Sequence, residues 1–374
     1  MSETKIEDLL EDTPIIGKEL KKERKTGIIG YLKQKRDWII YSILAFITFL
    51  GVYIRTLNIS KLKDVTTGTW TLGPDLDPFL FLRWAKYIVE HGSLMVIDTM
   101  RNVPLGYNTA SEMKLLSYII AWLFKFMSFF YKEVTVTYAA IWFPVIMFAL
   151  TTIAFFLFAR KIFYKESKKI RNIIALIATT FFIVIPSLLP RTIAGIPEKE
   201  PAGFFFMFMA FYLFLESITS EKITRGLIFG GLAGIFTGLL ALIWGGVSFV
   251  FMTIAGAILF AFLIGKINKK RFYFFSLWML AFLITMVPFS TRYSFNNLIT
   301  SISTTLVFMV FFILLIDFIL FKINIFNFRD KIKIKLPKPI VSMVLAGIDQ
   351  PLQNLSSYPF LMLFYCLKVL NLSF

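Results

Sequence analysis

Residues 136–159 read VTYAAIWFPVIMFALTTIAFFLFA, and residues 160–171, which follow directly, read RKIFYKESKKIR. The first stretch contains no Asp, Glu, Lys or Arg, and it is long enough for a helix to cross a bilayer, which takes about 20 apolar residues. The second stretch is rich in Lys and Arg, and membrane-protein loops with such an excess face the cytoplasm. Together the two stretches predict a transmembrane helix whose C-terminal end is cytoplasmic.

The composition of the whole chain agrees with this prediction. Of 374 residues, 57% are hydrophobic, and the mean hydropathy of +0.73 is typical of a polytopic membrane protein and not of a soluble domain. The predicted fold class is therefore all-α, a polytopic bundle of transmembrane helices. The net charge of +17 comes mostly from short basic loops, so it indicates membrane topology and no nucleic-acid partner.

The counts of cysteine and histidine exclude several kinds of site. The chain has one cysteine, Cys366, and one histidine, His91. A disulfide scaffold and a zinc site built from Cys and His ligands are therefore excluded. A hydrolase of the Ser-His-Asp or Cys-His type is disfavoured because His91 would have to serve alone, and we expect His91 to make a local hydrogen bond instead.

Further apolar runs predict the rest of the bundle. Residues 1–37 are polar and are expected to form a cytoplasmic tail, residues 38–340 form the transmembrane catalytic domain, and residues 341–374 are not assigned. Basic loops recur after every second run, as expected if successive loops alternate between the two sides of the membrane and the basic ones are cytoplasmic. The predicted spans are residues 38–54, 136–159, 172–190, 202–218, 226–243, 247–265, 272–288 and 301–321.

One more apolar piece, residues 115–131, is predicted not to cross the membrane. The tail and the first basic loop are both expected on the cytoplasmic side, which requires an even number of crossings between them. The spans at 38–54 and 136–159 already satisfy this, and Lys125 interrupts the piece. We therefore expect residues 55–135 to form one long external loop, with the apolar piece as a helix that lies on the membrane or dips into it.

Two acidic clusters fall in loops that this topology puts on the same external side. The first is DLDP at 75–78, and the second is EKE at 198–200 within the stretch RTIAGIPEKE. Carboxylates are costly near a membrane and usually serve a function there. Asp77, Glu198 and Glu200 offer hard oxygen ligands, which suit Mg²⁺ or Mn²⁺ and leave coordination positions for water or phosphate. A metal ion at this place would neutralise a departing lipid-linked diphosphate.

Three arginines and one tryptophan on the same side are further candidates for substrate contact. Arg83, Arg191 and Arg292 are able to contact phosphate oxygens through paired hydrogen bonds, and Trp244 begins a Trp-Gly-Gly turn. Plainer explanations also exist. The EKE cluster is consistent with a solvated turn, Arg191 with a helix end anchored at the headgroups, and Trp244 with an aromatic belt at the interface.

These motifs, taken together, resemble those of a known family. DPF at 77–79, with Arg83 and then AKYIVEHG at 85–92, resembles the first external loop of the catalytic subunit of oligosaccharyltransferases. RTIAG followed by EKE, within 191–200, is similar to the second acidic motif of that family in its archaeal form, and WGG at 244–246 is similar to a turn that follows two spans later. The matches keep the family's order and cover about residues 30–330.

The resemblance implies a multi-pass glycosyltransferase of the GT-C type in the cell membrane, with a cytoplasmic N-terminus and an external active site. Such an enzyme transfers an oligosaccharide from a dolichyl or undecaprenyl (di)phosphate to Asn in an Asn-x-Ser/Thr sequon of an acceptor polypeptide. By this resemblance Asp77 would bind Mn²⁺ or Mg²⁺ and contact the acceptor amide. Glu198, at a position usually held by Asp, and Glu200 would complete the metal site.

Two features of the family have no match in the sequence. No glutamate follows Glu221, so the Thr/Ser-x-x-Glu motif of a later loop is missing. The last tryptophan is Trp278, so the Trp-Trp-Asp motif of the soluble sequon-binding domain is missing as well. We therefore expect a truncated chain. The alternatives are another membrane glycosyltransferase that uses a polyprenyl-phosphate sugar, and a non-catalytic membrane subunit or transporter.

Overall fold

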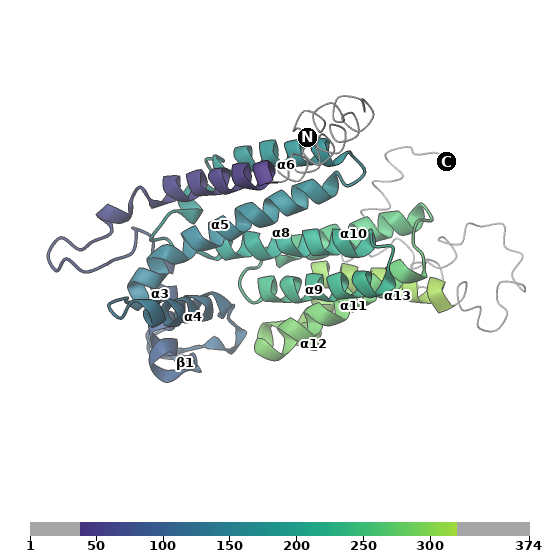
Figure 1. Cartoon of the computed structure of the whole chain (residues 1–374). Coiled ribbons are helices and arrows are strands. Elements are labelled where there is room, and N and C mark those ends of the chain that lie inside the picture. The colour runs from purple at the N-terminus through teal and green to yellow at the C-terminus, as the bar shows by residue number, and fades with distance from the viewer. Residues whose placement is uncertain (1–37, 320–374) are drawn as a thin grey trace, which may run out of the picture.

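The computed structural model describes residues 38–319, which are almost entirely helical (Figure 1). The predicted all-α fold is therefore confirmed. The predicted tail at 1–37, the unassigned segment at 341–374 and the end of the last predicted span lie outside the described residues.

Among the described residues, five helices are long and apolar enough to cross a membrane. Each corresponds to a predicted span, with somewhat different ends. They are Trp38–Lys61, α5 (Val136–Ile162), α8 (Lys199–Ile218), α9 (Ile223–Ala241) and Lys269–Phe289, which comprises α11 (Lys269–Met286) and the turn η3 (Val287–Phe289). Three apolar helices are shorter: α4 (Leu115–Phe130), α10 (Val247–Leu263) and α13 (Ile302–Asp317).

One predicted span is shorter than expected. The sequence predicts a helix over residues 172–190, but α6 runs from Lys168 to Ile183, and the short helix α7 (Leu189–Thr192) follows after a turn. Pro186 explains the difference, because proline lacks the amide hydrogen and disfavours helical backbone in the residue before it. The chain therefore leaves the helix early and turns toward the second acidic cluster.

The bundle is centred on α9, which packs against α8 and α11, while α8 also packs against α5. Glycine allows the closest of these approaches, since a Cβ added at Gly234 of α9 would overlap the carbonyl oxygen of Trp278 on α11. Small residues are common at helix contacts in membranes because they let two backbones approach. Aromatic side chains fill much of the remaining interior, among them Phe214, Phe251, Trp278 and Phe282.

The long loop between the first span and α5 folds at one end of the bundle (Figure 1). α4 packs against α3 and α5 and is shorter than a span, although its position outside the membrane stays a prediction. The loop contains η1 (Ile59–Lys61), α3 (Asp77–His91), the antiparallel strands β1 (Ile97–Asp98) and β2 (Tyr107–Asn108), η2 (Thr109–Ser111) and α4. The segment between α11 and α13 reaches the same end through η4 (Thr291–Tyr293), which contacts η2, and continues into α12 (Phe295–Thr300).

Candidate metal and phosphate site

Two glycines bring the two acidic loops together. The amide of Gly73, just before Asp75, donates to the carbonyl oxygen of Gly195 at 2.8 Å, and Gly195 lies just before Glu198. Gly195 has a φ of +83°, and a Cβ there would collide with the side chain of Leu62. Glycine adopts this backbone without strain, whereas other residues do not. The close approach of the two acidic clusters therefore depends on glycine at this position.

Arg55, near the end of the first span, anchors the loop that carries the second acidic cluster. Its buried guanidinium donates from Nε to Thr192 Oγ1 at 2.6 Å and from Nη1 to the carbonyl oxygen of Ile183 at 3.1 Å. Its own carbonyl oxygen accepts a hydrogen bond from the Ala194 amide at 2.9 Å. The motifs do not reveal this role, although an arginine within an apolar span is by itself a signal of function.

Asp77 is the first residue of α3, and Pro78 follows it. Proline suits this position because the first amides of a helix have no intrahelical partner, and a carboxylate is favoured there by the helix dipole. The Asp77 side chain is exposed and therefore accessible to a ligand. Asp75 is half-buried, and its Oδ1 accepts a hydrogen bond from the Leu76 amide at 2.7 Å.

Glu198 directly precedes α8 and is only 5% exposed. Burial, followed by the charges of Glu200, Asp75 and Asp77, raises the pKa of Glu198 to about 7. Arg191 opposes this shift weakly, because its guanidinium is half exposed and lies 3.7 Å from Glu198 Oε1. These four carboxylates, which we call the acidic patch, carry negative charge that the surrounding protein does not balance.

Glu200 has a carboxylate oxygen that no donor satisfies among the described residues. Its Oε2 atom is buried and has no hydrogen-bond partner within residues 38–319. A buried carboxylate oxygen without a donor is unfavourable, so a cation beside it would stabilise the fold. The oxygen donors of the patch suit Mg²⁺ or Mn²⁺. In the described part of the chain, no three Asp, Glu, His or Cys side chains already stand close enough to share one ion, so binding requires the carboxylates to rotate toward each other.

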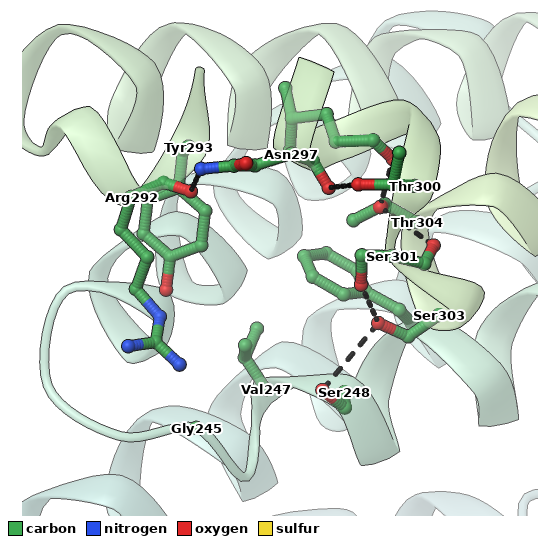
Figure 2. Close-up of a pocket in the computed structure, with 12 residues that line it drawn as sticks. Gly245, Val247, Ser248, Arg292, Tyr293, Asn297, Thr300, Ser301, Ser303 and Thr304 are labelled. Atoms are coloured by element: carbon green, nitrogen blue, oxygen red, sulfur yellow. Dashed lines mark hydrogen bonds between the residues drawn. The ribbon is translucent and has the colours of Figure 1, made fainter. Parts of the chain in front are cut away.

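Arg292 borders a cavity of about 390 Å³ next to the turn that follows Trp244 (Figure 2). The exposed Arg292 guanidinium points toward Gly245 on the other side of the cavity. Trp244 itself packs against Phe204 and over Gly203, in the first turns of α8 and close to the second acidic cluster. Trp244 therefore holds the turn that lines the cavity against the start of α8. Hydroxyl groups dominate the lining, from Ser248, Thr300, Ser301, Ser303 and Thr304.

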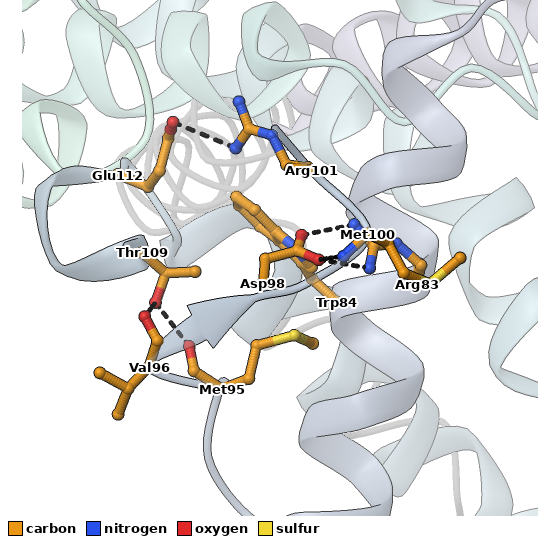
Figure 3. A network of polar contacts seen from close by, with 9 residues as sticks. All are labelled: Arg83, Trp84, Met95, Val96, Asp98, Met100, Arg101, Thr109 and Glu112. Carbon is orange, nitrogen blue, oxygen red and sulfur yellow. Dashed lines mark hydrogen bonds and ion pairs between the residues drawn. The ribbon is translucent and has the colours of Figure 1, made fainter. Parts of the chain in front are cut away.

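Arg83, which was predicted to contact phosphate, has a partner within the protein, and the predicted phosphate contact stays a prediction. Both terminal nitrogens of Arg83 donate to Asp98, which is fully buried, with 2.7 Å between Nη1 and Oδ1 (Figure 3). Asp98 also accepts hydrogen bonds from Trp84 Nε1 at 2.9 Å and from the Met100 amide at 3.1 Å. The hydrogen bond from Arg83 is the main reason why the pKa of Asp98 lies below its usual value. Arg83 therefore holds β1 against α3.

Other contacts within the long loop are also structural. Arg101 forms an ion pair with Glu112 at 3.3 Å (Figure 3). The Arg101 guanidinium also lies 4.1 Å from the ring centroid of Tyr107. Such cation–π contacts add to the attraction between the residues that make them. The predicted local hydrogen bond of His91 is confirmed, because His91 Nδ1 lies 3.2 Å from the carbonyl oxygen of Tyr87. The loop that presents Asp77 is thus fixed by its own side chains.

Comparisons of the sequence with known proteins agree with the motifs of this site. The family model described as oligosaccharyl transferase STT3, N-terminal, matches residues 36–365. A curated relative, the dolichyl-phosphooligosaccharide-protein glycotransferase of Methanococcus voltae, is 27% identical over 186 residues. That match covers 45% of this chain and 19% of the relative.

Solved structures of the Archaeoglobus fulgidus oligosaccharyltransferase have the same fold. The complex with Zn and sulfate matches with a TM-score of 0.63 and 20% identity, over 82% of this chain and 39% of that one. The complex with an inhibitory peptide and a dolichol-phosphate has a TM-score of 0.65 and 19% identity, over 84% of this chain and 37% of that one. The form tethered to an acceptor peptide with the NVT sequon has a TM-score of 0.64 and 19% identity, over 83% of this chain and 37% of that one. This chain therefore spans less than half the length of each relative. Because the family model covers most of the sequence, the chain belongs to the oligosaccharyl transferase STT3 family.

Proposed function

We propose that this chain carries the membrane-embedded catalytic part of an oligosaccharyltransferase. It would transfer an oligosaccharide from a lipid-linked (di)phosphate donor to the amide nitrogen of Asn in an Asn-x-Ser/Thr sequon. The observation that carries the proposal is the acidic patch, in which the buried Glu198 lies within the electrostatic influence of three other carboxylates, in a chain that belongs to the STT3 family. Related structures with a dolichol-phosphate and with an NVT peptide support the same classes of donor and acceptor.

Asp77 is suited to engage the acceptor, because it is exposed at the start of α3. Resonance makes an amide nitrogen a poor nucleophile, and a carboxylate that accepts its N–H hydrogen polarises the amide and lowers this barrier. Asp77 would therefore hold and orient the Asn side chain. Glu198 is buried, and Glu200 Oε2 has no hydrogen-bond donor among the described residues, so both carboxylates are available to add negative charge near Asp77.

The same carboxylates, Asp77, Glu198 and Glu200, would hold a divalent cation. When bound, Mn²⁺ or Mg²⁺ supplies positive charge that stabilises the departing phosphate oxygens. A related oligosaccharyltransferase has been solved in complex with Zn, which supports a divalent metal but not its identity. Oxygen-only ligands favour Mn²⁺ or Mg²⁺ over the metals that prefer Cys and His.

We expect two arginines to bind the phosphates of the donor. Arg191 is half exposed and lies beside Glu198, at the edge of the acidic patch. Arg292 is exposed and opens onto the hydroxyl-lined cavity, which offers hydrogen-bond partners for a polar headgroup. Arg83 would instead act indirectly, by fixing the loop that precedes α4 against α3.

The charge distribution supports an orientation with the N-terminus in the cytoplasm and the acidic patch on the external face. The loops that join α5 to α6 and α10 to α11 lie at the opposite end of their helices from the patch and are basic. Loops with excess Lys and Arg remain in the cytoplasm. The relevant residues are Lys161, Lys165, Lys168, Lys169 and Arg171 in one loop and Lys266, Lys269, Lys270 and Arg271 in the other.

The test is glycan transfer from a lipid-linked donor to an Asn-x-Thr peptide, measured in native membranes that contain the full-length protein. We expect Asp77→Asn to lower transfer by about 100-fold or more, the usual effect of removing a group that acts on the reacting atoms. Asp64→Asn makes the same change in the same loop outside the acidic patch and should leave transfer unchanged. Wild-type transfer by Asp77→Asn would reject the proposal, and use of a lipid monophosphate with a hydroxyl acceptor would favour the other class of glycosyltransferase.

A further inference from the structure

A second cavity lies at the end of the bundle opposite the acidic patch. α5 and α8 both begin at the end that carries the acidic clusters, and they pack side by side, so their C-terminal ends meet at the far end (Figure 1). α9 begins there, after the turn that follows α8. The cavity measures about 400 Å³ and lies among these three helix ends. It is lined by Lys161, Glu216, Thr219, Ser220, Glu221, Lys222 and Arg225.

An ion-pair network forms the inner wall of this cavity. Glu216 Oε1 lies 3.1 Å from Lys161 Nζ, and Glu216 Oε2 lies 3.2 Å from Arg225 Nη2. Lys161 and Glu216 are mostly buried, whereas Arg225 is 60% exposed. One carboxylate is thus shared by two cations, which leaves net positive charge at the wall. This fixed network holds the two cations on one side of the cavity.

The outer wall adds positive charge that has no partner. The ammonium of Lys222 makes no hydrogen bond or ion pair within residues 38–319. Lys270 approaches the rim from α11, where its Nζ donates to the carbonyl oxygen of Glu221 at 2.9 Å. The Glu221 carboxylate is exposed at the tip of the turn, where water and salt screen its charge. The cavity is therefore polar, cationic and open to an anion.

An apolar strip runs from this cavity along the outer face of α9. Arg225, Ile228, Leu232 and Ile235 follow one another at three- and four-residue spacing, so they lie on one face of the helix. Ile228 is 60% exposed, Leu232 38% and Ile235 40%. Because α9 is one of the helices long enough to cross a membrane, this strip faces lipid chains. A cationic cavity at the head of an apolar strip matches a phospholipid, with its phosphate at one end and its chain at the other.

We propose that the cavity at Lys161, Lys222 and Arg225 binds the phosphate headgroup of an anionic phospholipid whose chain lies along α9. The phosphate oxygens accept hydrogen bonds from Lys222 and Arg225, which both line the cavity. Basic pockets between transmembrane helices recognise anionic headgroups in this way. The bound lipid ties the end of α8 to the start of α9. This inference is independent of the proposed transfer reaction, because no residue of the acidic patch takes part.

The experiment is thermal unfolding of the purified protein in detergent with added phosphatidylglycerol, phosphatidylcholine or soluble glycerol phosphate. We expect phosphatidylglycerol alone to raise the unfolding temperature in a saturable way. Lys222→Gln should weaken its apparent affinity about fivefold, the effect expected for one lysine near an anionic lipid. The Lys222 ammonium has no partner among the described residues, and the carbonyl oxygen that accepts from Ser220 and Gly226 is kept in the variant, so the substitution should not disturb folding. Lys165→Gln is the matched control, since Lys165 is exposed at the same end but does not line the cavity.

Several outcomes would overturn the proposal. Equal stabilisation by phosphatidylcholine would show that the headgroup charge does not matter. Equal stabilisation by glycerol phosphate would show that an ion and not a lipid occupies the cavity. An equal loss of affinity in Lys165→Gln and Lys222→Gln would show that the positive charge acts as a diffuse surface. Loss of phosphatidylglycerol affinity in Lys222→Gln alone would support the site.

Discussion

Two buried carboxylates at the same end of this molecule, Asp98 and Glu198, have opposite surroundings. Asp98 accepts hydrogen bonds from Arg83, Trp84 and Met100, and Arg83 lowers its pKa. Glu198 has one weak ion pair at 3.7 Å, and burial and neighbouring carboxylates raise its pKa to about 7. The first carboxylate stabilises the fold, whereas the second costs free energy in its charged form.

The difference identifies which carboxylates serve structure and which are available for a ligand. A carboxylate whose oxygens are all satisfied by protein donors has little to gain from a cation. A carboxylate held among like charges gains much, and such arrangements are common at functional sites. The acidic patch is of this second kind, and the Asp98 network supports the loop beside it. Substitutions in the two groups should therefore differ in their effect on the free energy of unfolding, with the largest loss at Asp98.

Asp98→Asn is expected to destabilise the protein by about 3–5 kcal/mol, because the substitution removes one partner of a buried ion pair and places an amide donor against Arg83 and Trp84. The measurement is the free energy of unfolding in denaturant. Asp64→Asn, the same change in an exposed turn, should alter stability much less, because the amide oxygen of Asn can accept the same hydrogen bonds and no buried ion pair is lost. Equal stability of Asp98→Asn and the wild type would contradict the structural role assigned to Asp98.

Stability should fall as the pH rises through the window set by Glu198. Folding raises the pKa of Glu198 from its ordinary value of 4.5 to about 7, so between these pH values the folded state keeps a proton that the unfolded chain releases. The contribution of Glu198 is therefore complete below pH 4.5 and is lost by pH 7, a change of about 3 kcal/mol.

The difference in stability between the wild type and Glu198→Gln, measured at several pH values without metal, tests this expectation. This difference should change by about 3 kcal/mol between pH 4.5 and pH 7, because the amide of the Gln variant does not titrate. Added Mn²⁺ or Mg²⁺ at pH 8 should stabilise the wild type more than the variant, since a ligand that binds only the folded state adds stability. A difference that does not depend on pH would contradict the raised pKa of Glu198.

Arg191→Gln should have the smallest effect on stability, below about 0.5 kcal/mol, because the pair with Glu198 is long and Arg191 is 52% exposed. Its clearer effect should be on the pH window, which moves upward because Arg191 opposes the rise in the pKa of Glu198. The same pH series measures this movement. Arg292→Gln is the control, because Arg292 is not among the groups that shift Glu198, and a movement of equal size there would refute the specific pairing.

Much of the fold could be predicted from the sequence because its signals are local. Long apolar runs and basic loops predicted each of the five long helices, and the acidic clusters pointed to the loops that meet at Gly73 and Gly195. The prediction for residues 172–190 was wrong in extent, because apolar character continues past Pro186 where the helix cannot. The predicted roles of Asp77, Glu198 and Glu200 stay predictions until metal binding and transfer are measured.

The partners of individual side chains were beyond the reach of sequence patterns. Arg83 was predicted to bind phosphate, but it pairs with Asp98, 15 residues away, across a loop whose path no motif specifies. Arg55 holds Thr192 from 137 residues away. Such contacts depend on how loops cross one another at the end of the bundle, and the apolar pattern of the helices contains no information about that.

Apolar run length, the spacing of basic loops and the residue types of the two acidic clusters determined the helical membrane fold and its candidate ligands, because each acts through the chain's immediate neighbours and solvent. Tertiary structure alone decided which carboxylate is paired with a cation, as Asp98 is with Arg83, and which is buried among other carboxylates, as Glu198 is. That outcome depends on burial and on the positions of distant charges, since the energy of a carboxylate is set by the groups around it in space.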